Sequence, residues 1–141
     1  MINKALVRDK LALLMQYLTE LQQVASHSQQ EFEQDLFVKR TGERTVELVV
    51  ECAVDINNHF TVEVGGRQPT EYYQSFTEMG RLGVITPDLA LALAPTAGLR
   101  NRLVHAYETV MDDLTYRALQ RMIPQYAEYV RQIDQWLTQR S

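Results

Sequence analysis

Residues 100–107 read Arg-Asn-Arg-Leu-Val-His-Ala-Tyr and combine side chains suited to phosphodiester chemistry. The planar guanidinium of Arg100 can bind two phosphate oxygens at once and favour a pentacovalent transition state. Histidine changes its protonation state near neutral pH, so His105 can both accept and release a proton. Beside a ribose 2′-hydroxyl or a leaving 5′-oxygen, such a group accelerates cleavage by about 10²–10⁴-fold. RNA supplies its own 2′-oxygen nucleophile, so no metal is required.

The spacing of these residues limits how they can act together. On a straight helix, Arg100 and His105 lie about 140° apart, and Tyr107 returns to within about 20° of the face of Arg100. Asn101 shares a face with His105, four residues away. A site that uses both Arg100 and His105 therefore needs a bent helix or two copies of the motif meeting across a dimer. We favour the dimer.

Other catalytic motifs are absent from the sequence. The six glycines form no Gly-x-Gly pair, so neither a dinucleotide fingerprint nor a Walker loop is present. There is no Gly-x-Ser-x-Gly elbow, no His-Glu-x-x-His and no Glu-x-x-His pair of the kind that binds two iron ions in helical bundles. A single cysteine excludes an internal disulfide and a cysteine-only zinc site. We expect neither a metal nor another cofactor.

Composition is typical of one ordinary globular domain, which we expect to span residues 1–141. The chain is 45% hydrophobic and 23% charged, with a formal charge of −4. The acidic balance argues against non-specific coating of nucleic acid but leaves room for a local basic pocket. The longest uncharged apolar stretch, Leu89–Leu99, has eleven residues, whereas a membrane span needs roughly 20. With no signal-peptide core, we expect a cytoplasmic protein without membrane contact.

Hydrophobic residues recur at helical spacing in three long seams, and no segment shows sustained period-two alternation. The sequence therefore predicts an all-α fold, an antiparallel bundle of five to six helices. The seams are Val7, Leu11, Leu14, Leu18, Leu21 and Ala25; Val46, Val49, Ala53, Ile56 and Phe60; and Leu119, Met122, Tyr126, Tyr129, Ile133 and Trp136.

Capping residues and helix breakers predict where the helices begin and end. Ser28, with a glutamate three positions later, is expected to cap a short helix. The next helix is expected to start after Thr41-Gly42. Prolines lack an amide hydrogen, so we expect Pro95 to break or kink one helix and Pro124 to divide the last. Residues 112–113, both aspartates, are expected to cap that last helical region.

The motif Arg-Asn-x-Leu-Val-His-x-Tyr, late in a small helical chain, resembles the HEPN superfamily. More closely it resembles the HepT-type toxins, whose hallmark is Arg-x4-His-x-Tyr. The resemblance extends over nearly the whole chain, through the long first helix, the Val-Asp-Ile-Asn-Asn-His stretch at 54–59 and the Ile-Pro-x-Tyr segment at 123–126. It implies an HEPN-like bundle that forms a homodimer, with both motifs lining the cleft between protomers.

The resemblance also implies a function, that of the toxin in a toxin–antitoxin pair. Such a toxin is a metal-independent endoribonuclease, neutralised when a minimal nucleotidyltransferase antitoxin transfers AMP to the motif tyrosine. Carried over, Arg100 and His105 would be catalytic. Asn101 would help to hold the site, and Tyr107 would be the site of AMPylation. An adenylyl group there adds a phosphodiester charge and a bulky base where the substrate phosphate should bind.

Two other functions stay open at this level. A non-catalytic HEPN module could hold a nucleotide or a partner protein; residues 94–131 carry five arginines against four carboxylates, a weak attraction for a long polyanion. The second open function is that of a helical scaffold that binds no ligand.

Three further features invite a functional interpretation. Glu51, Asp55 and His59 form an i, i+4, i+8 ladder with the residue types of a metal or proton-relay site. We favour a polar stripe stabilised by local pairing, at the dimer seam. Cys52 is expected to be an inert buried thiol. The tyrosines at 72, 73, 126 and 129 could stack on bases, but their helical spacing favours the core or an interface.

Overall fold

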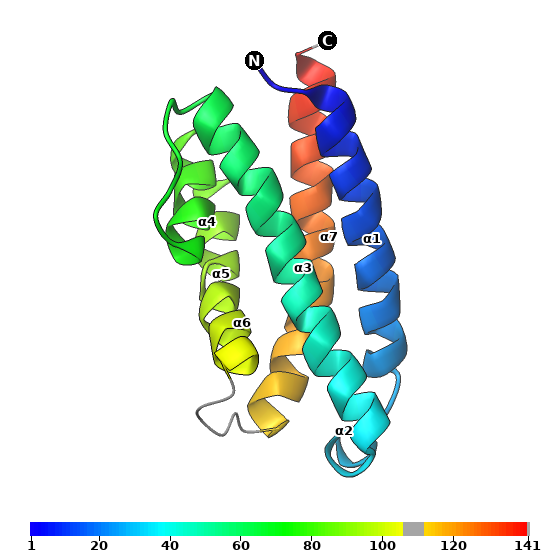
Figure 1. Ribbon diagram of the computed structural model, residues 1–141. Helices are drawn as coiled ribbons and strands as arrows, with labels where there is room; N and C mark the ends of the chain where they lie inside the picture. Colours follow the sequence, from blue (N-terminus) through cyan, green and yellow to red (C-terminus); the bar gives the residue numbers. More distant parts are fainter. Residues whose placement is uncertain (106–111, 141) are drawn as a thin grey trace.

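The computed structural model describes residues 1–105 and 112–140, where all regular secondary structure is helical (Figure 1). The all-α class predicted from the sequence is therefore confirmed. The helices are α1 (Lys4–Ala25), α2 (Gln29–Gln34), α3 (Leu36–Glu63), α4 (Tyr72–Arg81), α5 (Pro87–Leu93), α6 (Pro95–His105) and α7 (Asp112–Gln139).

Three long helices form one layer of the bundle, and shorter ones cover one side of it. α1 runs antiparallel to α3 and α7 and packs against both. α4, α5 and α6 descend along the other side of α3, so that α6 ends beside the start of α7 at the lower end in Figure 1. No helix in residues 1–105 or 112–140 has the length and apolar character needed to cross a bilayer.

The predicted hydrophobic seams supply much of the core. Every predicted residue of the three seams is buried, except for Ala25 and Trp136 near helix ends, which are half-buried. Their burial removes apolar surface from water, which is the main favourable contribution to folding. The seams of α1, α3 and α7 thus bring these helices together.

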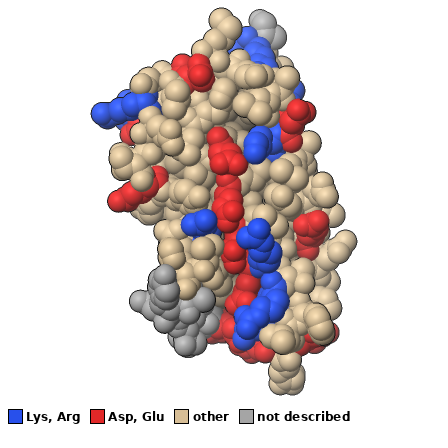
Figure 2. Space-filling model, in the orientation of Figure 1, with Lys and Arg blue, Asp and Glu red and all other residues tan. Residues whose placement is uncertain are grey.

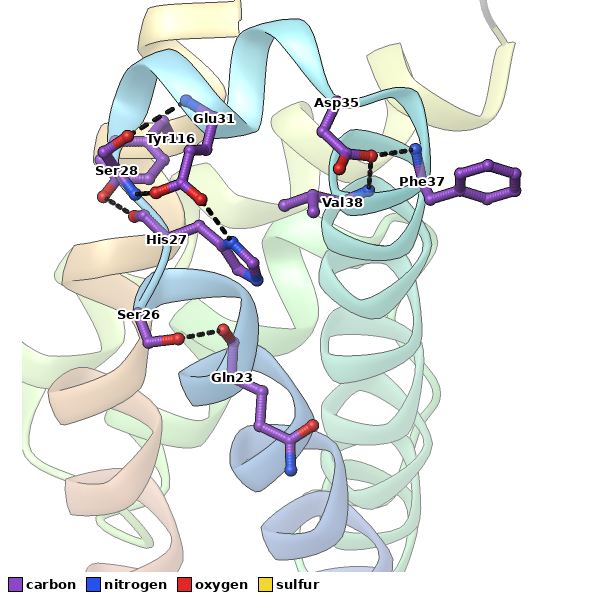
Figure 3. Close-up of polar contacts among 9 residues, drawn as sticks. All are labelled: Gln23, Ser26, His27, Ser28, Glu31, Asp35, Phe37, Val38 and Tyr116. Carbon is purple, nitrogen blue, oxygen red and sulfur yellow. Dashed lines mark hydrogen bonds and ion pairs between the residues drawn. The ribbon is translucent and has the colours of Figure 1, made fainter.

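Polar contacts fix the turn that joins α1, α2 and α3 (Figure 3). Ser28 Oγ accepts a hydrogen bond from the Glu31 backbone (3.1 Å), and the Glu31 carboxylate accepts one from the Ser28 backbone (3.0 Å). The short helix capped by Ser28 is thus confirmed. The hydrogen bond from the Ser28 backbone, helped by His27, lowers the pKa of Glu31. The hydroxyl of Tyr116 donates to the His27 carbonyl (2.6 Å), which ties the turn to α7.

The predicted start of the next helix is wrong, because α3 begins at Leu36 rather than after Thr41-Gly42. Asp35 caps it by accepting a hydrogen bond from the Phe37 backbone at 2.9 Å. Gly42 lies within the helix, where a Cβ would come within 2.7 Å of a Phe32 ring carbon. The glycine therefore permits close packing of α2 on α3 and does not end a helix.

The two prolines behave differently. Pro95 is the first residue of α6, and α5 ends at Leu93, so the predicted break is confirmed. The prediction that Pro124 divides the last helix is wrong, because α7 continues through it. Pro124 and Gln120 are both exposed, so water can reach the Gln120 carbonyl that loses its helical donor. The buried residues on either side hold the helix in place.

The two aspartates expected to cap the last helix lie in the first turn of α7. Asp112 forms an ion pair with Lys39 of α3 at 2.9 Å, and Asp113 forms one with Arg117 at 2.6 Å. Negative charge in a first turn is favoured by the helix dipole. The position before Asp112 lies outside the described residues.

Candidate functional site

The motif lies on α6, an unbroken helix from Pro95 to His105. Thr96, Ala97 and Leu99 are buried and anchor the helix to the rest of the bundle. Because the helix is continuous, the side chains of Arg100 and His105 leave it about 140° apart. The break at the start of α6 precedes the motif, so it does not bring the two side chains onto one face.

Arg100 is held by groups from three helices. Its Nε donates to Glu51 of α3 at 3.4 Å, and its Nη1 donates to Asn101 at 3.2 Å. Its guanidinium carbon lies 4.7 Å from the ring centroid of Tyr72 on α4, a cation–π contact. The Arg100 side chain is only 19% exposed. These contacts orient the guanidinium before any ligand arrives.

A buried chain of hydrogen bonds supports the aromatic ring that packs on Arg100. The Tyr129 hydroxyl donates to Asn57 Oδ1 (2.5 Å), and Asn57 Nδ2 donates to Ser75 Oγ (3.1 Å). Ser75 Oγ in turn donates to the Tyr72 carbonyl at 2.7 Å. The side chains of Tyr129, Asn57 and Ser75 are fully buried. Burial raises the pKa of Tyr129 well above its ordinary value, so this phenol remains a neutral donor.

The other motif residues are placed as follows. His105 is the last residue of α6 and is exposed. Asn101 is exposed and contacts Arg100. The predicted AMPylation site, Tyr107, lies outside the described residues. The structure thus brings Arg100 and Asn101 together, whereas His105 leaves the helix on a different side from Arg100.

A line of carboxylates runs along the exposed face of α3 beside α6, and cations flank it (Figure 2). The carboxylates recur every four residues, and each pairs with a cation. The pairs are Glu43 with Arg40 (2.9 Å), Glu47 with Arg44 (3.1 Å), Glu51 with Arg100 (3.4 Å) and Asp55 with Lys10 (3.3 Å). The negative charges on this face of α3 are therefore neutralised by neighbouring cations, and Arg100 of α6 is one of these cations.

Glu51, Asp55 and His59, the three residues of the ladder, each contact a different partner. Glu51 pairs with Arg100, Asp55 pairs with Lys10, and His59 Nε2 accepts a hydrogen bond from the Asn3 backbone at 3.0 Å. Over the described ranges, no three His, Cys, Asp or Glu side chains are grouped to hold a metal ion. The three residues form a polar stripe, but the predicted local pairing is wrong, because Glu51 pairs with Arg100 of α6 and Asp55 pairs with Lys10 of α1.

Two residues singled out in the sequence belong to the core. Cys52 is buried, as predicted, and its burial raises the pKa of the thiol to about 11. Its Sγ donates to the Lys10 carbonyl at 3.4 Å. A thiol with so little thiolate at neutral pH is a poor nucleophile. Tyr126 is fully buried and hydrogen-bonded to Thr96 at 2.7 Å, so it is a core residue and cannot stack on a base.

Sequence reasoning missed the groups that hold Arg100. The sequence pattern groups Glu51 with neighbours on its own helix and predicts Tyr72 in the core or an interface. Glu51 and Arg100 are 49 positions apart in the chain, so no local spacing marks their contact. The ion pair exists only because α6 packs against α3.

Comparison with known proteins identifies a family and similar proteins. The family model described as Ribonuclease HepT-like matches residues 14–133. The tRNA nuclease HepT of Aphanizomenon flos-aquae (strain 2012/KM1/D3) is 31% identical over 136 residues, 96% of this chain and 92% of that protein. The mRNA nuclease HepT of Shewanella oneidensis is 25% identical over 125 residues, 89% of this chain and 93% of that protein.

A solved structure has the same fold. It is the tri-AMPylated HEPN toxin of Shewanella oneidensis in complex with an MNT antitoxin, with a TM-score of 0.84 and 24% identity. The match covers 95% of this chain and 98% of the toxin chain. The similarity therefore includes nearly the whole helical bundle.

Proposed function

The chain belongs to the family of HepT-like ribonucleases, and on that premise we propose that it is an endoribonuclease toxin of a toxin–antitoxin pair. The proposed catalytic residues are Arg100 and His105, with Asn101 helping to orient Arg100. The observation that carries the proposal is that one helix holds a pre-oriented guanidinium and an exposed imidazole. The protein is also similar to a tRNA nuclease and an mRNA nuclease, which supports the proposed activity.

The proposed reaction uses the ribose 2′-hydroxyl as the nucleophile. Its oxygen attacks the adjacent phosphorus while the bond from phosphorus to the 5′-oxygen breaks, giving a 2′,3′-cyclic phosphate and a 5′-hydroxyl. His105 either removes the 2′ proton or delivers a proton to the 5′-oxygen, and solvent balances the other proton. Arg100 stabilises the additional negative charge on the phosphoryl oxygens in the transition state. This sequence of steps needs no metal ion.

We propose a homodimer because of the direction in which the two side chains point. A single α6 helix separates Arg100 and His105 by about 140°, so one copy of the helix does not direct both at the same phosphate. A two-fold axis beside α6 would place Arg100 of one protomer opposite His105 of the partner subunit. Two equivalent sites would then lie in one cleft between the protomers.

Incubation with RNA in EDTA tests catalysis and metal independence together. We expect the purified protein to generate new RNA ends carrying 5′-hydroxyl groups, which polynucleotide kinase labels without prior phosphatase treatment. Purified tRNA and mRNA should be assayed separately, since the named relatives differ in this respect. RNA with 2′-O-methyl riboses serves as the control and should stay intact. Binding without any cleavage would instead support the non-catalytic HEPN module.

The proposed antitoxin is a minimal nucleotidyltransferase that transfers AMP to Tyr107. The tri-AMPylated toxin with the same fold, bound to its MNT antitoxin, supports this partner. The intact mass of the protein co-expressed with such an enzyme should rise by one or more adenylyl units. The increment should disappear in Tyr107→Phe and persist in Tyr73→Phe, a matched change at a half-exposed tyrosine. An increment that survives in Tyr107→Phe would assign the modification elsewhere.

A further inference from the structure

A cavity of about 340 Å³ lies between α6 and the first half of α7. We refer to it as the α6–α7 pocket. Its floor is apolar and includes the buried Leu99 and Met122, together with the half-buried Ala118. Arg102 of α6 and Arg121 of α7 are exposed and also line the pocket. Two cations from different helices thus lie around one hydrophobic surface.

These two arginines differ from most others in the protein. Arg100 pairs with Glu51, and Arg117, one turn before Arg121, pairs with Asp113. In residues 1–105 and 112–140, by contrast, neither Arg102 nor Arg121 makes a hydrogen bond or an ion pair. Among the described residues that line the pocket, none carries a carboxylate. The pocket therefore offers two guanidinium groups whose donors are available to an anion.

The combination of groups fits a nucleotide. A phosphate can accept hydrogen bonds from one or both arginines. A base has a flat apolar face that suits the accessible apolar lining, the exposed Leu114 and the half-buried Ala118. Gln125 adds an amide that can donate to and accept from the edge of a base. An acidic peptide would use the arginines but would leave the apolar floor with less contact.

The position of Arg102 relates the pocket to the proposed catalytic site. Arg102 lies three residues before His105, so their side chains leave α6 only about 60° apart and on neighbouring turns. Arg100 lies about 160° away from Arg102 around the helix. A phosphate bound by Arg102 would therefore be near the one on which His105 acts.

We propose that the α6–α7 pocket binds one nucleotide of the RNA substrate next to the scissile phosphate. This inference rests on the proposed ribonuclease function and names a second contact with its substrate. Arg102 and Arg121 bind the phosphate of that nucleotide, and its base packs on the exposed Leu114 and the half-buried Ala118. The pocket thereby positions the RNA and contributes to the choice of cleavage site.

Binding of an uncleavable RNA tests the pocket without requiring catalysis. The probe is a short fluorescent oligonucleotide with 2′-O-methyl riboses, and its Kd is measured by anisotropy at several salt concentrations. Arg102→Gln and Arg121→Gln should each raise the Kd about tenfold. Each should also reduce the steepness of the dependence of log Kd on log salt by about 0.7, the value for one lost phosphate contact with a single strand. A merely structural role would not change the salt dependence.

Arg67→Gln is the matched control. Arg67 also makes no ion pair with another described residue, but it lies in the segment between α3 and α4. The substitution removes the same charge, so the Kd and its salt dependence should stay close to the parent values. In the cleavage assay, the two pocket variants should raise KM about tenfold and leave kcat within about twofold, because the reacting groups are untouched.

The outcomes separate this inference from the proposed function. If the parent cleaves RNA and both pocket variants keep its Kd and KM, the pocket inference is wrong and the ribonuclease proposal stands. If the parent cleaves no RNA but binds the probe through both arginines, the nuclease proposal fails and the nucleotide pocket stands. If the variants bind the probe normally but lose the co-purified nucleotidyltransferase, the pocket is a protein-docking surface and the inference is overturned.

Discussion

Replacing His105 with alanine is expected to lower the rate of RNA cleavage by about 10²-fold or more, because the substitution removes the proposed proton-transfer group. The fold should persist, since His105 is exposed at the end of α6 and is not part of the core. The measurement is kcat for RNA cleavage, with circular dichroism and thermal melting to confirm the fold. His59→Ala is the matched control; it changes a histidine near the end of α3 and should retain the parent rate.

A folded His105→Ala protein that cuts RNA as fast as the parent would show that the assignment of this residue is wrong. A large loss in both His105→Ala and His59→Ala would point to a different use of the histidines, in which the α3 ladder takes part. The two variants together therefore locate the functional imidazole.

Mixing two inactive variants tests whether the site is shared between protomers. In a heterodimer of Arg100→Ala with His105→Ala, one of the two shared sites would keep both its arginine and its histidine. An equimolar mixture that exchanges freely should recover about a quarter of the parent activity, since about half of the dimers are mixed and each has one intact site. A mixture that stays inactive despite verified subunit exchange would place both groups of a site within one chain.

Replacing Asn57 with leucine is expected to destabilise the fold by about 2–3 kcal/mol, because it breaks a fully buried hydrogen-bond chain. Leucine removes the acceptor of the Tyr129 hydroxyl and the donor to Ser75 Oγ. The Tyr129 hydroxyl keeps the Ala53 carbonyl at 3.1 Å as a second acceptor, which limits the loss. The measurement is the free energy of unfolding from urea denaturation.

Asn58→Leu is the control for this substitution. Asn58 adjoins Asn57 on α3 but is only half-buried, so its replacement should change the free energy of unfolding by no more than about 0.5 kcal/mol. Combining Asn57→Leu with Tyr129→Phe should cost less than the two single changes added together, because both remove the same hydrogen bond. Equal effects of Asn57→Leu and Asn58→Leu would mean that the buried chain adds little to stability.

Local sequence rules worked where they describe one helix and failed where two helices meet. Ser28 caps α2 because its hydroxyl reaches a backbone amide three residues later, a contact within the segment itself. The sequence predicts a helix that starts after Gly42, yet Gly42 lies within α3, where the Phe32 ring packs against it. Pro124 was expected to divide a helix, yet buried residues on both sides keep α7 continuous. In both failures, packing outweighed a local preference.

The sequence by itself determined the helical class, the three buried seams and the motif at residues 100–107, because each is written as spacing along a single helix. Tertiary structure alone decided that Glu51 and Tyr72 hold Arg100 and that Arg102 and Arg121 face one pocket. Those relations depend on how far each helix is rotated and shifted against its neighbours. The entire core sets that rotation and shift through close packing, so no short stretch of sequence specifies them.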